Sequence, residues 1–197
     1  MAKPYVMRRA LPGDLPIVMG IVNERASWLY LRGSDQWNQG LAYDAKLARR
    51  VERGLTWLLE DDGTPIATVT VLRRSRSVLW TPEEVAEPAI YGWKLATAVE
   101  RAGEGLTGLL FQWGQDWAAH LGVRCIRWSV WGASHGLHAH YQRTGAGLVR
   151  TVEVPTGEAA ALFQLPARPV PGLSARMVTA AGEDRDAVCL HPAPTAA

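Results

Sequence analysis

The sequence has few cysteines, little net charge and no long hydrophobic run. Its two cysteines, Cys125 and Cys189, have the spacing of neither a disulfide framework nor a zinc site, and they predict reduced thiols in a cytoplasmic protein. The net charge of +2 does not indicate the strongly basic surface that binds nucleic acid. No apolar run approaches the roughly 20 residues that span a bilayer, and the first ten residues predict no signal peptide. We therefore expect neither nucleic acid nor a membrane as a partner.

Tryptophan, in contrast, is abundant. The 197 residues include nine tryptophans, and 48% of the residues are hydrophobic, as is usual for a globular chain that buries a core. Because an indole is large and carries a polar N–H, we expect some of the nine to line a ligand groove. Trp113 and Trp117 share the apolar face of a helical pattern and are expected in the core.

Hydrophobic periodicity and turn residues predict the element order β-α-α-β-β-β-α-β-α-β-β. Strands are expected over 5–10, 56–61, 64–72, 89–97, 125–131, 148–154 and 160–165. Helices are expected between Asp14 and Gly33, over 43–53, from Leu106 to Gly122, and between Ser134 and Gly145. Gly92 predicts a bulge inside the strand over 89–97.

The composition shifts to proline, alanine and glycine after residue 167. We therefore expect one domain over residues 1–167 and a tail over 168–197. Two β-like runs in the tail, "ARMVT" and "AVCL", could form a small added hairpin, which could serve as a contact in a homodimer.

The segment "AGEGLTGLL", from Ala102 to Leu110, places two glycines directly before a predicted helix. Such a turn leaves several backbone N–H groups pointing one way at the positive end of the helix dipole, which makes a phosphate site without a basic side chain. No Lys-Ser or Lys-Thr follows, so this is not a P-loop. Taken alone, the glycines leave two interpretations open: a phosphate site, or a turn that simply needs glycine.

The run from Trp93 to Val149 resembles the GNAT superfamily of acyl-CoA-dependent N-acetyltransferases, whose pattern is a strand, R/Q-x-x-G-x-G/A, a helix, a strand, an Asn and Y-x-x-x-G-F. Gly105 stands at the first required glycine, and Tyr141 lies four residues before Gly145. The earlier "ASWLYLRGSDQWNQG" resembles the helix and acceptor loop of one bacterial branch, so the resemblance covers about 5–167. The chain departs from the pattern at four places: Ala102, Thr107, Ser134 and Ala146.

The resemblance implies an α/β (α+β) fold with a mixed, mostly antiparallel central sheet, a splayed strand pair and helices on both faces. It implies acetyl-CoA as co-substrate, no metal, and direct attack by the primary amine of a small molecule in a ternary complex. Two alternatives stay open: a catalytically weak acyl-CoA-binding regulatory module, and an acetyltransferase for protein N-termini or lysines.

The same resemblance assigns residues to the acetyl-CoA site, at the end of one strand, along the glycine turn and on the short helix. These are Leu95, Ala96, Thr97, Arg101, Ala102, Gly103, Glu104, Gly105, Leu106, Thr107, Gly108, Ser134, Leu137 and Tyr141. A backbone N–H near Lys94 to Ala96 would bind the acetyl carbonyl. Tyr141 would act as the acid, because a phenol with a pKa of about 10 is protonated at neutral pH and can donate to the leaving sulfur. The alternative for Tyr141 is a packing role.

The resemblance places Trp37, Trp80 and Trp93 around the acceptor amine, where aromatic walls would suit an aromatic or cationic amine; packing in the core is the alternative for each. No general base is evident in the sequence. Four carboxylates are candidates through water, although each taken singly is better explained as a solvated loop or hairpin charge: Glu60, Asp61, Glu83 and Glu84. His135, His138 and His140 share one short segment, but a helix directs His140 away from the other two, so no metal site is expected.

Overall fold

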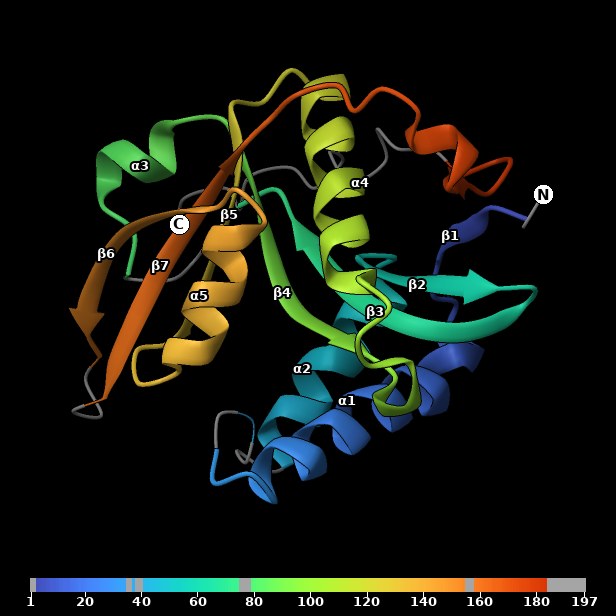
Figure 1. The fold of residues 1–197 in the computed structure, drawn as a ribbon, viewed down its shortest axis with the longest axis horizontal. Coiled ribbons are helices and arrows are strands. Elements are labelled where there is room, and N and C mark those ends of the chain that lie inside the picture. Colours follow the sequence, from blue (N-terminus) through green and yellow to red (C-terminus); the bar gives the residue numbers. More distant parts are fainter. Residues whose placement is uncertain (1–2, 35–36, 38–40, 75–78, 155–157, 184–197) are drawn as a thin grey trace, which may run out of the picture.

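The computed structural model describes residues 3–34, 37, 41–74, 79–154 and 158–183. They form an eight-stranded sheet in the order β6-β7-β5-β4-β3-β2-β1-β8 (Figure 1). The strands are β1 (Tyr5–Arg9), β2 (Thr56–Asp61), β3 (Thr64–Leu72), β4 (Ala89–Thr97), β5 (Cys125–Trp131), β6 (Gly147–Glu153), β7 (Ala159–Pro166) and β8 (Met177–Thr179). The α-helices are α1 (Leu15–Tyr30), α2 (Leu41–Glu52), α3 (Pro82–Ala86), α4 (Leu106–His120) and α5 (His135–Arg143).

The predicted element order and fold class are confirmed. The sheet is mixed and mostly antiparallel, with parallel pairing between β4 and β5 and between β1 and β8. β2, β3, β4 and β5 have the predicted bounds. β1 differs from its prediction by one residue at one end, and β6 and β7 differ by one residue at each end. One more short helix, α3, lies between β3 and β4.

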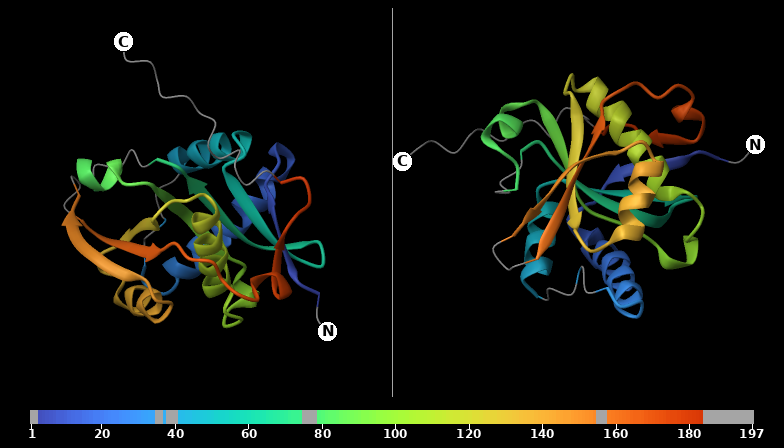
Figure 2. Two further views of the ribbon diagram at one scale, coloured as in Figure 1. Left: turned by 90° about the horizontal axis from the view of Figure 1, so that it is seen from above. Right: turned by 60° about the vertical axis from the view of Figure 1, so that its left-hand side comes forward.

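Helices cover both faces of the sheet (Figure 2). Alternation along β2 shows the two faces: Trp57 and Leu59 pack in the cluster with α4, whereas Leu58 packs in the cluster with α1 and α2. The Trp57 ring lies 5.2 Å from each of the rings of Trp113 and Trp117. All three indoles are buried, so the predicted core role of the two helical tryptophans is confirmed.

A bulge interrupts β4, but not at Gly92. Gly92 pairs regularly with β3, and the register shifts between Trp93 and Ala96, where Lys94 has a left-handed φ of 51°. The extra residue changes which face each side chain takes. Leu95 therefore packs on the α4 side, while Trp93, Ala96 and the Lys94 side chain lie on the α1 and α2 side.

β4 and β5 pair only over a short stretch. Ala89–Tyr91 pairs with Cys125–Arg127, whereas β5 stays paired with β7 as far as Trp131. Beyond these residues the two parallel strands separate (Figure 1). The central sheet thus has the splayed strand pair that the sequence resemblance implied.

Residues 168–183 continue the domain beyond the boundary expected at residue 167. Met177 in the run "ARMVT" pairs with Tyr5, and β8 adds a parallel edge strand beside β1. The second run, "AVCL", lies outside the described residues. None of the helices in the described part of the chain is both long and apolar enough to cross a membrane.

Candidate active site

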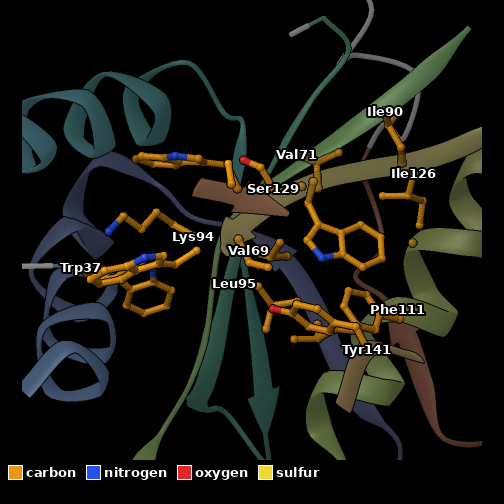
Figure 3. A pocket seen from close by; sticks show the side chains of 18 of the residues that line it. Trp37, Val69, Val71, Ile90, Lys94, Leu95, Phe111, Ile126, Ser129 and Tyr141 are labelled. Carbon is orange, nitrogen blue, oxygen red and sulfur yellow. The ribbon is translucent and has the colours of Figure 1, made fainter. Parts of the chain in front are cut away.

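A cavity of about 400 Å³ lies where β4 and β5 separate (Figure 3). Both faces of the sheet contribute to its walls. Side chains of β3, β4, β5 and α4 line it together with Tyr141 from α5, Trp37 from the connection between α1 and α2, and Val154, Glu158, Ala159 and Ala160 around the connection between β6 and β7. The cavity therefore connects the α4 and α5 side with the α1 and α2 side.

Tyr141 forms part of the wall on the α5 side. Its ring lies 5.4 Å from the rings of Phe111 and Trp128 and 5.5 Å from that of Phe163, and its hydroxyl points into the cavity toward β4 (Figure 3). Burial raises the pKa of the Tyr141 phenol well above its usual value. The cavity thus contains a protonated O–H donor held in place by aromatic packing, and its role as an acid stays a prediction.

The glycine turn before α4 has the backbone that a phosphate site needs. Gly103 and Gly105 have φ values of 91° and 75°, and Gly105 is the N-cap of α4. The first N–H groups of a helix have no partner within it. A methyl group in place of the Gly108 hydrogen would meet no heavy atom within 4 Å, so the space beside the first turn of α4 is open. Leu110, one turn further along, already lines the cavity.

Arg101, the nearest cation to that turn, is held by two carboxylates. Its Nε donates to Glu104 Oε1 at 2.6 Å and its Nη2 donates to Asp61 Oδ2 at 2.8 Å. These bonds raise the pKa of Arg101. Arg101 and Glu104, both expected to contact acetyl-CoA, thus neutralise each other, and the turn offers an anion its backbone amides.

Arg25 was missed by the sequence reasoning. From α1 its Nη2 donates to the carbonyl and hydroxyl of Thr97, both at 2.8 Å, and to the carbonyl of Ala98 at 3.2 Å. These hydrogen bonds therefore hold the end of β4 against α1 just before the chain enters the glycine turn. Both oxygens of Thr97, an expected acetyl-CoA contact, accept hydrogen bonds from Arg25.

The other predicted acetyl-CoA residues lie in different surroundings. Leu95 lines the cavity, Ala96 and Leu106 are buried, and Leu137 packs against the core. Ser134 is the N-cap residue of α5 without a side-chain cap bond. Ala102 at the turn is exposed, and Thr107 and Gly108 in the first turn of α4 are half-exposed.

Two of the three predicted acceptor tryptophans line the cavity. Trp37 and Trp93 do so, and the Lys94 Nζ lies 4.6 Å from the Trp37 ring centroid and 5.8 Å from that of Trp93. The expectation for Trp80 is corrected, because this residue is buried in another hydrophobic cluster. Its ring lies 6.1 Å from the Tyr91 ring, and this packing between distant residues places the Trp80 loop against the sheet. Trp131, at the end of β5, lines the cavity and was not predicted.

Sequence reasoning considered the backbone near Lys94 but missed its side chain. Burial lowers its pKa to about 8, and the negative charge of Asp44 acts in the opposite direction. A strand of strict alternation would place Lys94 opposite to Trp93. The bulge brings the two to the same side, and only the pairing with β3 reveals it.

The four carboxylates considered as bases lie elsewhere among the described residues. Glu60 accepts from Arg8 at 2.7 Å, and Asp61 accepts from Arg101. Glu84 accepts from Arg150, and Glu83 is exposed on α3. Among the described acidic residues, Glu158 contributes to the lining of the cavity; it is exposed and stands directly before β7.

The three histidines of α5 are spread as expected. His138 Nε2 lies 3.0 Å from the Trp131 carbonyl oxygen, and His140 lies beside Tyr141. In the part of the chain that the structure describes, no group of three or more His, Cys, Asp or Glu side chains could hold a metal ion.

Comparisons with known proteins find acetyltransferases of one family. The sequence model of the acetyltransferase (GNAT) family matches residues 22–146. The uncharacterized N-acetyltransferase YesJ of Bacillus subtilis is 28% identical over 138 residues, which are 67% of this chain and 76% of YesJ. A GNAT family acetyltransferase from Listeria monocytogenes has the same fold with a TM-score of 0.66 and 18% identity, over 82% of this chain and 94% of that one. One from Streptococcus agalactiae matches with a TM-score of 0.68 and 16% identity, over 85% and 98%.

Proposed function

The chain belongs to the acetyltransferase (GNAT) family of N-acetyltransferases, and on that premise we propose that it transfers the acetyl group of acetyl-CoA to the primary amine of a small molecule. The observation that carries the proposal is the cavity between the separating strands β4 and β5, which begins one helical turn from the glycine turn. Its volume of about 400 Å³ is in the range of small-molecule sites.

The glycine turn supports a site for the pyrophosphate of acetyl-CoA. The N–H groups of the first turn of α4 would donate to its oxygens, and the helix dipole adds roughly half a positive charge there. Glu104 would repel an anion, and its ion pair with Arg101, which Arg101 shares with Asp61, offsets part of that repulsion. The left-handed φ of Gly105 is one that a branched residue would adopt only with strain.

The acetyl group would lie in the cavity between Tyr141 and the bulge of β4. The neutral amine attacks the thioester carbon, whose oxygen accepts a hydrogen bond from a backbone N–H near Lys94 to Ala96. As the C–N bond forms, the C–S bond breaks, and the products are an acetamide and the thiol of coenzyme A.

Tyr141 would stabilise the leaving thiolate. Complete transfer of the phenol proton to a thiolate is unfavourable by about 2 kcal/mol on ordinary pKa values, and the raised pKa of Tyr141 makes it more so. We therefore infer that Tyr141 donates a hydrogen bond to the sulfur, while the proton that the nitrogen loses ultimately reaches the thiolate. Glu158 is the described carboxylate best placed to take that proton from the nitrogen, directly or through water.

The proposal is tested by incubating the protein with acetyl-CoA and a panel of primary amines while free thiol is followed. We expect amine-dependent release of thiol, together with the acetylated amine by mass spectrometry. Thiol release no faster than in buffer across aromatic, aliphatic and amphoteric amines would contradict a small-molecule acceptor. Acetylation of a peptide panel under the same conditions would then point to a protein substrate.

A further inference from the structure

The aromatic part of the cavity on the α1 and α2 side already holds a cation. Trp93 and Lys94 leave β4 on this side because of the bulge. The centroid of the Trp37 ring lies 4.6 Å from the Lys94 Nζ (Figure 3). Lys94 is only 9% exposed, although it lines the cavity. A lysine ammonium thus sits where an aromatic-walled site would otherwise bind the ammonium of a ligand.

The charge of the wall can be read from its lining residues. Among the described residues, those of ionic charge that line the cavity are Lys94 and Glu158. Asp44 on α2 also acts on Lys94, but burial has the larger effect and lowers the pKa of Lys94 to about 8, so the ammonium form still predominates at neutral pH. A second cation beside this ammonium would be repelled, whereas an anion would gain a partner in a region of low dielectric.

We propose that the acceptor is an amphoteric molecule, an amine that also carries a carboxylate and an apolar, preferably aromatic, body. The Lys94 ammonium binds the carboxylate, and the indoles of Trp37, Trp93 and Trp131 enclose the body. This inference rests on the proposed function, and it narrows the expected aromatic or cationic amine to one that also carries a carboxylate.

The position of Lys94 beside the reacting atoms supports the assignment. The carbonyl of the acetyl group is expected at the bulge, within one residue of Lys94, and Leu95 lines the cavity next to it. An acceptor whose carboxylate is held by Lys94 would therefore have its amine only a few bonds away. Amino acids with an aromatic side chain have this spacing of amine, carboxylate and ring.

The test compares phenylalanine with phenylalanine methyl ester, which keeps the amine and the ring but lacks the negative charge. The quantity measured is the ratio of kcat/KM for the acid to kcat/KM for the ester, each corrected for the neutral fraction of its amine. We expect the wild-type ratio to exceed ten. In Lys94→Met, which keeps an unbranched side chain as far as the Cε atom but removes the ammonium, the ratio should fall at least tenfold, mainly through KM for the acid. Lys94→Arg should keep most of the ratio.

Lys3→Met is the matched control, because Lys3 is an exposed lysine paired with Asp62 at the far end of β2 and should leave the ratio unchanged. Equal use of ester and acid by the wild type, or an unchanged ratio in Lys94→Met, would overturn the inference and leave the proposed acetyl transfer standing. Absence of thiol release with every amine would instead overturn the proposed function.

Quenching of tryptophan fluorescence by 3-phenylpropanoate and by its amide gives a measurement that does not need turnover. Tighter binding of the acid, lost in Lys94→Met, is expected. Equal binding of acid and amide would also overturn the inference. Thermal melting establishes that each variant is folded.

Discussion

Arg101 donates to Asp61 Oδ2 at 2.8 Å and so ties the glycine turn before α4 to the end of β2. The side chain of Arg101 also donates to Glu104, and the two carboxylates together hold the cation nearest to the expected pyrophosphate. Ala102 stands where the pattern has Arg or Gln, and these two contacts keep the neighbouring basic side chain of Arg101 close to the turn.

Asp61→Asn should release Arg101 from one of its carboxylates and make it available to a phosphate. We expect acetyl-CoA to bind more tightly by about two- to fivefold, in line with the roughly 0.2–1 kcal/mol of an exposed ion pair, and the gain should shrink as salt is added. Calorimetry at low and high ionic strength measures both. Asp62→Asn, which breaks the neighbouring pair with Lys3, is the control. Weaker binding in Asp61→Asn would mean that the pair serves to hold the turn in shape.

Gly105→Val should weaken acetyl-CoA binding by at least tenfold. The φ of 75° costs a branched residue about 1–2 kcal/mol, and its side chain would stand in front of the N–H groups of α4. Gly122→Val is the matched control, because Gly122 has a φ of 65° at the other end of the same helix. Both variants should melt earlier than the wild type, but only Gly105→Val should lose affinity. An unchanged affinity in a folded Gly105→Val would exclude the turn as the pyrophosphate site.

Local signals account for most of the predicted fold. The strands over 56–61, 64–72, 89–97 and 125–131 follow from hydrophobic runs between turn residues, and all four have the predicted bounds. The sequence predicts the bulge at Gly92 because glycine is the usual local signal. Its actual position at Lys94 depends on how β3 pairs with β4, which is a contact between distant residues and leaves no mark in the local sequence.

In the candidate site too, local motifs could be predicted from the sequence, whereas features that depend on contacts between distant residues could not. The glycine turn and Tyr141 could be found because each is a short motif with its own spacing. Trp80 was misplaced because its burial depends on Tyr91, which a loop composition does not reveal. Lys94 was missed because the bulge in β4 decides which face of the sheet its side chain takes. Glu158 was missed because the pairing of β6 with β7 brings it to the cavity. Both are tertiary features.

The free energy of unfolding should depend on pH in part through Lys94. Burial lowers the pKa of Lys94 to about 8 from 10.5 in the unfolded chain, so the unfolded state binds more protons between these values. The free energy of unfolding contributed by Lys94 therefore rises with pH between about 8 and 10.5. Lys94→Met has no such dependence. Its melting temperature should exceed that of the wild type at pH 7, and the difference should narrow by pH 10. A constant difference would contradict the lowered pKa.

Glu158→Gln should slow acetyl transfer at neutral pH by roughly 10²–10⁴-fold if Glu158 takes the proton of the attacking amine. The loss should lessen as the pH rises, since more of the amine is then already neutral. Steady-state rates from pH 6 to 10 give the comparison. Glu83→Gln, at an exposed carboxylate of α3, is the matched control and should follow the wild type throughout. A rate loss in Glu158→Gln that is the same at every pH would contradict the base role.

Tyr141→Phe separates a catalytic hydroxyl from a packed ring. The variant keeps the ring that contacts Phe111, Trp128 and Phe163, so the melting temperature and the affinity for acetyl-CoA should change little. Loss of the O–H that donates to the leaving sulfur should slow the chemical step by roughly 10²–10³-fold, which is typical of removing one donor that stabilises charge in a transition state. Single-turnover transfer, with enzyme in excess over acetyl-CoA, isolates that step from product release.

The pH dependence of the same reaction tests the protonation state of Tyr141. Because burial raises the pKa of its phenol, the wild type should show no loss of rate from phenol ionisation up to pH 10. Tyr5→Phe, in a strand at the other end of the sheet, is the control for removal of a phenol as such. Full single-turnover activity in Tyr141→Phe would reduce Tyr141 to a packing residue, and the thiolate would then have to leave by drawing its proton from the acceptor nitrogen or from water in the cavity.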